Sequence, residues 1–218
     1  MVVSRTRRGA SSRVCADVVS AYTRAVTAAD IPLFPLNTVL FPGGELELRV
    51  FERRYLDMVR DCTRNDSGFG VCLILHGSDA GDPAIPAAIG TLARIVDFYT
   101  TDGGLLGIRA IGEQRFRIAH TRVRDNGLVR GQAHFWPDEP ALPMPPEFAL
   151  LATIGERLLE KQGTRFARAS LDDATWVGFR LAEALPLENR ERQHLLQLTD
   201  PLERLQQLMH YLPRFQRA

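Results

Sequence analysis

The sequence predicts an α+β fold, in which a β-rich N-terminal unit with one helix is followed by a C-terminal region of four helices. Three observations support this prediction. Apolar and polar residues alternate in segments between residues 89 and 136, separated by Asp-Gly and Asn-Gly turns. A cluster of prolines follows, from Pro137 to Pro146. Beyond it, apolar residues recur every three or four positions, as amphipathic helices require.

These patterns divide the chain into parts. Residues 1–29 are rich in Ser, Ala and Arg and carry five Arg against one Asp, so we expect a disordered tail or an over-extended gene start. Residues 30–136 form the β-rich unit, residues 137–146 a proline-rich linker, and residues 147–214 the helical unit.

The composition is that of an ordinary soluble protein. The chain has 218 residues, 45% of them hydrophobic, with 27 Lys and Arg against 26 Asp and Glu, so the body has no charge excess for polyanion binding. Cys15, Cys62 and Cys72 form neither a CxxC pair nor an even set, which indicates a reducing compartment, and we expect the cytoplasm. No apolar run approaches the roughly 20 residues of a membrane-spanning helix, so no membrane partner is expected.

The β-rich unit is expected to open with extended segments. Closely spaced prolines exclude a helix over residues 31–36 and predict an edge strand there. Residues 45–50 alternate with period two, which predicts a strand that buries Leu46, Leu48 and Val50. From residue 51 to 64 the period becomes three or four, which predicts a helix whose buried face is formed by Phe51, Tyr55, Met58, Val59 and Cys62.

The rest of the unit is predicted to be a meander. A continuous apolar run over residues 71–75 predicts a strand buried on both faces. Residues 76–88 contain several Gly and Pro and predict a loop of the length that is often functional. Strands are then expected over residues 89–99, 105–111, 114–123 and 128–136.

The helical unit is predicted from stop and start signals. Helices are expected over residues 147–162, with Gly163 as the stop, and over residues 172–185, where Asp172 and Asp173 complement the dipole at the start. A third covers residues 188–198. The last begins after Asp200, with Pro201 as its first residue and a capping box from Asp200 to Glu203.

The sequence lacks the motifs of the common enzyme chemistries. Lys161 lies between Glu160 and Gln162 on a predicted helix, so it belongs to no phosphate-binding loop and is expected to be a solvated charge rather than a peptidase base. The five histidines show no metal-ligand spacing. We therefore expect no catalytic residue, no cofactor and no metal, and predict that the chain is not an enzyme; an unrecognised hydrolase is the least favoured hypothesis.

RNA binding is an alternative, because Arg115, Arg117, Arg122 and Arg124 could line a basic strand face beside aromatic residues. Period two argues against it. It places Phe116 on one face and both Arg115 and Arg117 on the other, which is the ordinary division of a half-buried strand.

Several motifs, taken in order, resemble those of the Lon protease N-terminal (substrate-binding) domain family. The N-terminal motifs are Ile31-Pro-Leu-Phe-Pro-Leu36, Val39-Leu-Phe-Pro-Gly43 and Leu46-x-Leu-x-Val-Phe-Glu-x-Arg-Tyr55. The middle is matched by Gly90-Thr-x-Ala-x-Ile95 and Gly107-x-x-x-Ile-Gly-x-x-Arg-Phe-Arg-Ile118, and the C-terminal helices by the stretch from Leu185 to Leu205. The resemblance extends from Ile31 to about Leu212.

The resemblance implies a PUA-like pseudo-barrel followed by a helical bundle, without cofactor. In Lon proteases this domain recognises substrate, while separate ATPase and Ser–Lys peptidase modules do the chemistry. Neither module is found in this sequence, so we expect a stand-alone Lon N-domain protein of bacterial type. A related domain in cereblon docks onto a ubiquitin-ligase adaptor. The implied function is a non-catalytic protein- or peptide-binding module, as an adaptor or chaperone-like factor linked to proteolysis.

The expected partners are unfolded protein or peptide segments, or a protease or chaperone acting in trans, with a homo-oligomer as an open alternative. We expect an extended peptide to add to the edge formed by Phe34, Leu36, Val39 and Phe41. The loop over residues 76–88 is the second candidate surface. The remaining family-motif residues are expected to be structural, with Glu52, Arg54 or Arg115 in an internal ion pair: Gly43, Glu52, Arg54, Tyr55, Gly107, Arg115 and Phe116.

Overall fold

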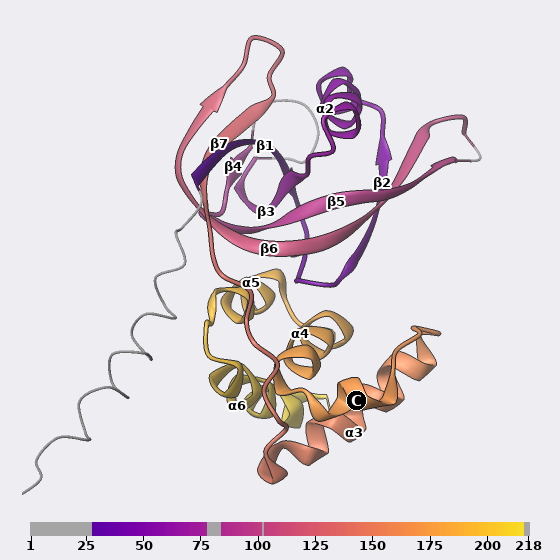
Figure 1. The fold of residues 1–218 in the computed structure, drawn as a ribbon, viewed down its shortest axis with the longest axis vertical. Helices are drawn as coiled ribbons and strands as arrows, with labels where there is room; N and C mark the ends of the chain where they lie inside the picture. Colours follow the sequence, from indigo (N-terminus) through magenta and orange to yellow (C-terminus); the bar gives the residue numbers. More distant parts are fainter. Residues whose placement is uncertain (1–27, 78–83, 102, 216–218) are drawn as a thin grey trace, which may run out of the picture.

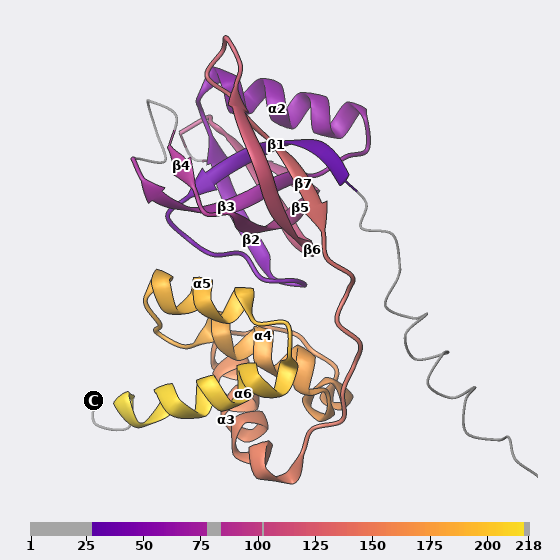
Figure 2. The same ribbon diagram turned by 90° about the vertical axis from the view of Figure 1, so that its left-hand side faces the viewer.

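The chain folds into a β unit and a helical unit, one stacked on the other (Figures 1 and 2). The computed structural model describes residues 28–77, 84–101 and 103–215. The predicted tail lies almost wholly outside these ranges, as do Cys15 and residues 78–83 of the candidate loop over residues 76–88. The α+β class predicted from the sequence is confirmed.

The β unit is a closed ring of strands. The strands are β1 (Ala28–Leu36), β2 (Glu45–Val50), β3 (Phe69–His76), β4 (Ile85–Pro86), β5 (Ile89–Thr100), β6 (Leu106–Val123) and β7 (Val129–Phe135). Antiparallel pairings run from β1 through β7, β6 and β5 to β3, and a parallel pairing of β3 with β1 closes the ring. Two strands pair with members of the ring without being part of its closure: β2 pairs with β6, and β4 pairs with β3.

The prediction that residues 31–36 form an edge strand is wrong. Strand β1 pairs with β7 through residues 28–32 and with β3 through residues 33–36, so it lies within the ring. Each half of β1 is paired on one side only. Pro32 and Pro35 are therefore tolerated, because the backbone N–H that each proline lacks is not needed for a second ladder.

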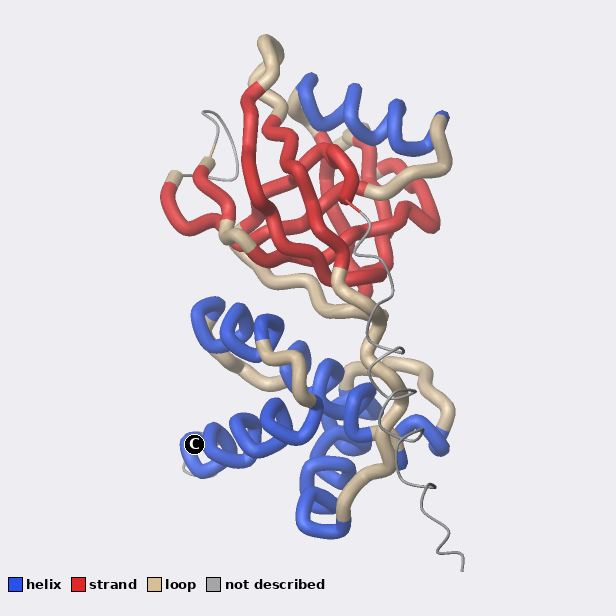
Figure 3. The backbone as a smooth tube through the Cα atoms, turned by 60° about the vertical axis from the view of Figure 1, so that its left-hand side comes forward, coloured by secondary structure: helices blue, strands red, loops and turns tan. Residues whose placement is uncertain are grey.

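The two strands expected over residues 105–111 and 114–123 are a single strand, β6. Gly112, in the gap between the two predicted strands, lies where β6 passes the chain before β2. A Cβ atom at Gly112 would be 2.2 Å from the carbonyl oxygen of Phe41, so close backbone approach explains the glycine. The first half of β6 pairs with β2 and its second half with β7. Figure 3 shows the strands, in red, together in one part of the molecule.

Helix α2 (Arg53–Arg64) covers the ring with an apolar face. Tyr55, Met58, Val59 and Cys62 are buried against the strands, as the three-to-four spacing predicted. Phe51 is the exception: it precedes the helix, and 58% of its surface is exposed.

The four predicted helices of the second unit are all present, as α3 (Ala149–Lys161), α4 (Ala174–Ala184), α5 (Asn189–Gln197) and α6 (Pro201–Tyr211). Short 3₁₀ turns flank them at Pro146–Phe148, Arg168–Asp172 and Leu212–Arg214. Gly163 ends the first helix region at a φ of 72°. Asp173 caps α4 through the N–H of Thr175, and Asp200 caps α6 through that of Leu202.

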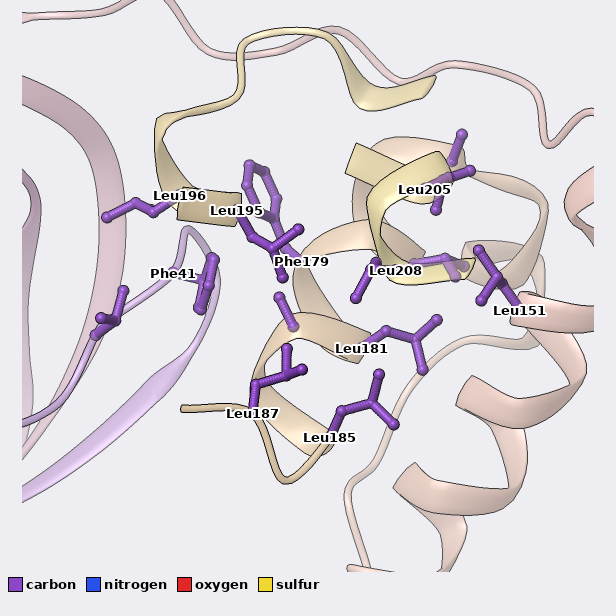
Figure 4. Close-up of a cluster of buried hydrophobic side chains, with 14 of the residues drawn as sticks. Phe41, Leu151, Phe179, Leu181, Leu185, Leu187, Leu195, Leu196, Leu205 and Leu208 are labelled. Atoms are coloured by element: carbon purple, nitrogen blue, oxygen red, sulfur yellow. The ribbon is translucent and has the colours of Figure 1, made fainter. Parts of the chain in front are cut away.

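The two units share one core. Phe41, from the connection between β1 and β2, inserts among the leucines of the helices (Figure 4). Val39, Leu73 and Ala87 of the β unit belong to the same cluster. The proline-rich segment also packs against the helices, because the hydroxyl of Thr175 donates to the carbonyl of Pro140 at 2.9 Å.

Candidate functional site

An apolar pocket opens between β1 and β2, where the two strands do not pair. It has a volume of about 200 Å³, below the roughly 300–1,000 Å³ of small-molecule sites, so it suits one large side chain of a partner. The rings of Phe34 and Tyr55 stack at its base with centroids 3.9 Å apart. The β1–β2 pocket is lined by Phe34, Leu36, Leu48, Arg49, Val50, Phe51, Glu52 and Tyr55.

Exposed aromatic residues extend this apolar surface. Leu48 of the pocket is aligned across β6 and β5 with Ile108 and Phe98, so the three side chains share one face of the sheet. Ile108 is buried, but 47% of Phe98 is exposed, as is 58% of Phe51 at the pocket rim. Soluble proteins rarely leave neighbouring large apolar side chains uncovered without an interaction that uses them.

The structure brings together only part of the predicted peptide edge. Phe34 and Leu36 line the β1–β2 pocket, whereas Val39 and Phe41 are buried in the core shared with the helices. Residues 33–36 of β1 pair with β3 on one side, so an added strand could pair only with their other side, and Val39 and Phe41 take no part in such an edge. Of the candidate loop, Ile85 and Pro86 pair with β3.

Most family-motif residues have structural contacts. Arg54 pairs with Glu52 at 2.9 Å, donates to the carbonyl of Gly127 and lies over the Tyr55 ring, so one predicted internal ion pair is present. Phe116 is fully buried in the ring. A Cβ atom at Gly107 would collide with the ring of Tyr99, 2.3 Å away.

Arg115 lies on the outer face of β6, as the alternation predicts, but this face is not exposed at that position, and Arg115 forms an internal ion pair. Only 4% of it is exposed, because β6 faces the helical unit at that position. Its guanidinium donates to the carboxylate of Glu139 and to the carbonyls of Leu196 and Leu198, at 2.8 and 2.6 Å. Burial lowers the pKa of Arg115 to about 10, although Glu139 opposes this shift.

A second buried arginine shares the same carboxylate. Arg204 of α6 is fully buried, donates to Glu139 at 2.6 and 2.8 Å, and lies 4.0 Å over the ring of Phe179. Sequence reasoning missed both Glu139 and Arg204. The available signal was the helical spacing of Arg204 with Leu208 and Leu212, which places it on the apolar face of its helix.

A polar cavity of about 580 Å³ lies at the other side of the contact between the units. Arg180 pairs with Glu183 at 2.7 Å and donates to the carbonyls of Pro42 and Gly43. Burial raises the pKa of Glu183 to about 7, against the opposing charge of Arg180. Because Arg180 joins Glu183 to the backbone before β2, these contacts give the ion pair a role in holding the two units together.

The basic face considered for RNA is reduced. Arg115 is buried, whereas Arg117, Arg122 and Arg124 are exposed, and Arg122 donates to Asp30 at 2.6 Å. Among residues 28–77, 84–101 and 103–215, no group of three His, Cys, Asp or Glu residues could hold a metal ion. No helix in those ranges is long and apolar enough to cross a membrane.

Comparison with known sequences places these features in a family. A family model described as the ATP-dependent protease La (LON) substrate-binding domain matches residues 30–214. The chain is 30% identical to protein cereblon of Danio rerio over 113 residues, which are 50% of this chain and 26% of the relative. It is 32% identical to Lon protease 2 of Myxococcus xanthus over 91 residues, 40% of this chain and 11% of that protease. The aligned region thus spans about a quarter or less of these relatives.

Solved structures agree with the fold. A Lon N-terminal domain protein from Xanthomonas campestris has 49% sequence identity and a TM-score of 0.73, covering 84% of this chain and 98% of that one. The N-terminal domain of Mycobacterium avium complex Lon protease has 17% identity and a TM-score of 0.61, covering 84% and 97%, and supports the fold alone.

Proposed function

This chain belongs to the Lon substrate-binding domain family, and from that premise we propose that it is a non-catalytic module that binds unfolded protein or peptide segments. The observation that supports this most is the β1–β2 pocket, with exposed Phe51 in its lining and exposed Phe98 two strands away on the same face of the sheet. A pocket of one side chain's size, with uncovered aromatic rings at its rim and further along the sheet, suits a partner that presents separate large apolar residues.

We infer that the module serves as an adaptor or chaperone-like factor for a protease or chaperone that acts in trans. Cys62 and Cys72 are free and buried, which fits a reducing compartment, and we place the protein in the cytoplasm. RNA binding is the less favoured alternative, because Arg115, one of the four arginines of the predicted basic face, is buried between the two units.

The test is a titration with a fluorescein-labelled, carboxymethylated protein that cannot refold, followed by fluorescence anisotropy. Phe51→Ser and Phe98→Ser should each weaken binding by about tenfold, as loss of an aromatic anchor does. Leu150→Ser is the matched control, because Leu150 is 51% exposed but lies on α3 of the helical unit.

The proposal fails if the wild-type protein shows no binding at micromolar concentration, or if the control weakens binding as much as the two Phe variants do. A parallel titration with single-stranded RNA tests the alternative. RNA binding that falls steeply with salt, together with loss of binding in Arg117→Glu, would favour it.

A further inference from the structure

One edge of β2 is unpaired. Gly112 donates to the carbonyl of Gly44 at 2.8 Å and accepts from the N–H of Gly43 at 2.7 Å. In an antiparallel ladder the hydrogen-bonded positions recur at every second residue, so the N–H and C=O groups of residues 46, 48 and 50 point toward β6. The N–H and C=O groups of Glu45, Glu47 and Arg49 therefore point away from β6. Among the described residues, no hydrogen bond outside the β2–β6 ladder uses these groups.

The side chains of β2 match this open edge. Glu45, Glu47 and Arg49 are exposed, while Leu46 and Leu48 are only partly buried, although they face the apolar side of the sheet. An edge that exposes several backbone groups and two leucines is a template for another strand. The residue order in β2 indicates which kind of partner strand would match this edge.

The strand is nearly complementary to itself. If a second copy of β2 lies antiparallel and centred on Glu47, then Glu45 faces Arg49 of the second copy, and Arg49 faces Glu45 of the second copy. Leu46 and Leu48 face each other in the same way on the apolar side. The outward backbone groups of residues 45, 47 and 49 meet the same groups of the other strand, so every ladder bond can form.

We propose that the free edge of β2 is a self-association edge, through which two copies of this chain pair as an antiparallel, two-fold symmetric dimer. Glu47 is the one mismatch, since it faces Glu47 of the second copy at the symmetry axis. A six-residue strand is about 20 Å long and covers less area than the roughly 1,600 Å² of a standard interface, so association is weak and depends on concentration.

The test is sedimentation equilibrium of the full chain over a wide concentration range. Arg49→Glu and Glu45→Arg each replace two attractive cross-strand pairs with repulsive ones and should raise the dimer dissociation constant by about tenfold. The double variant Glu45→Arg/Arg49→Glu restores the attraction and should return the constant to its wild-type value. Glu47→Gln removes the repulsion at the axis and should strengthen the dimer.

Arg124→Glu is the control, because it makes the same charge change at an exposed position in the β6–β7 turn. Circular dichroism verifies that each variant is folded. A wild-type chain that stays monomeric throughout overturns the proposal, as does a dimer that Arg49→Glu leaves intact or that the double variant fails to restore. If the chain is monomeric but Arg49→Glu weakens binding of the unfolded probe protein, the β2 edge binds unfolded protein rather than a second copy of the chain, and the proposal is again overturned.

Discussion

Replacing Glu139 with Gln should destabilise the protein by about 3–5 kcal/mol, because the substitution removes the carboxylate from a buried ion network. The side chains of Arg115, Arg204 and Glu139 expose only 4%, 0% and 7% of their surface. Gln keeps the shape of the side chain but leaves two buried guanidinium groups without a compensating charge. Their mutual repulsion already contributes to the lowered pKa of Arg115. The loss is a large fraction of the roughly 5–15 kcal/mol that stabilises a typical domain.

Urea unfolding measures this effect in each unit separately. Trp136 lies at the end of β7, and Trp176 lies on α4, so the variants Trp136→Phe and Trp176→Phe each leave one fluorescent reporter. Because Glu139 connects the two units, Glu139→Gln should also separate their unfolding midpoints. Glu191→Gln is the control, since its partner Arg214 is 48% exposed and solvent screens the pair, so its loss should have little effect on stability. A loss in Glu139→Gln no larger than that of the control would refute the reasoning.

Three further predictions concern single residues. Burial raises the pKa of Glu183 to about 7, so folding favours its protonated form: the stability that this group contributes is present at pH 4 and is lost as the pH rises to about 7. Because of this group, the unfolding free energy of the wild type should fall by on the order of 2–3 kcal/mol between pH 4 and pH 7. Glu183→Gln should abolish that fall, and a variant with the same pH dependence as the wild type would contradict the raised pKa of Glu183. Phe34→Ala should cost about 3–5 kcal/mol in urea unfolding, because the 5%-exposed ring stacks on Tyr55, whereas Phe98→Ala should cost less than about 1 kcal/mol. Burial raises the pKa of the Cys62 and Cys72 thiols, so iodoacetamide should modify neither in the native protein; peptide mass spectrometry detects the modification that would disprove this.

The elements that the sequence predicted well are those whose signals are local. The period of three to four over residues 53–64 follows from the geometry of one helix on one sheet, and it placed Tyr55, Met58 and Cys62 correctly. The turn at residues 124–127 depends on a few adjacent residues, and Gly127 of its Asn-Gly pair has a positive φ. Such signals need no knowledge of distant parts of the chain.

The errors concern residues whose role is set by distant neighbours. Gly112 resembles a strand break until the approach of Phe41, 71 positions earlier, is known. Alternation placed Arg115 on the outer face of β6 correctly, but the helical unit covers that face at this position. The proline-rich segment gave no sign that Glu139 would be buried between two arginines, since one of them lies 65 residues away.

The same long-range contacts determine the shape of the candidate site. The chain between β1 and β2 leaves the pocket wall at Leu36, passes into the helical core through Val39 and Phe41, and returns to β2 after Gly44. Arg180 of α4 holds this connection by donating to the carbonyls of Pro42 and Gly43, at 2.5 and 3.0 Å. Since β1 and β2 are not hydrogen-bonded to each other, the separation of the two pocket walls depends on where the helical unit fixes the connection between them. The helices therefore contribute, together with the pairing of β1 and β2 to other strands, to the position of the β1–β2 pocket without lining it, and we expect the proposed binding surface to depend on both units of the chain.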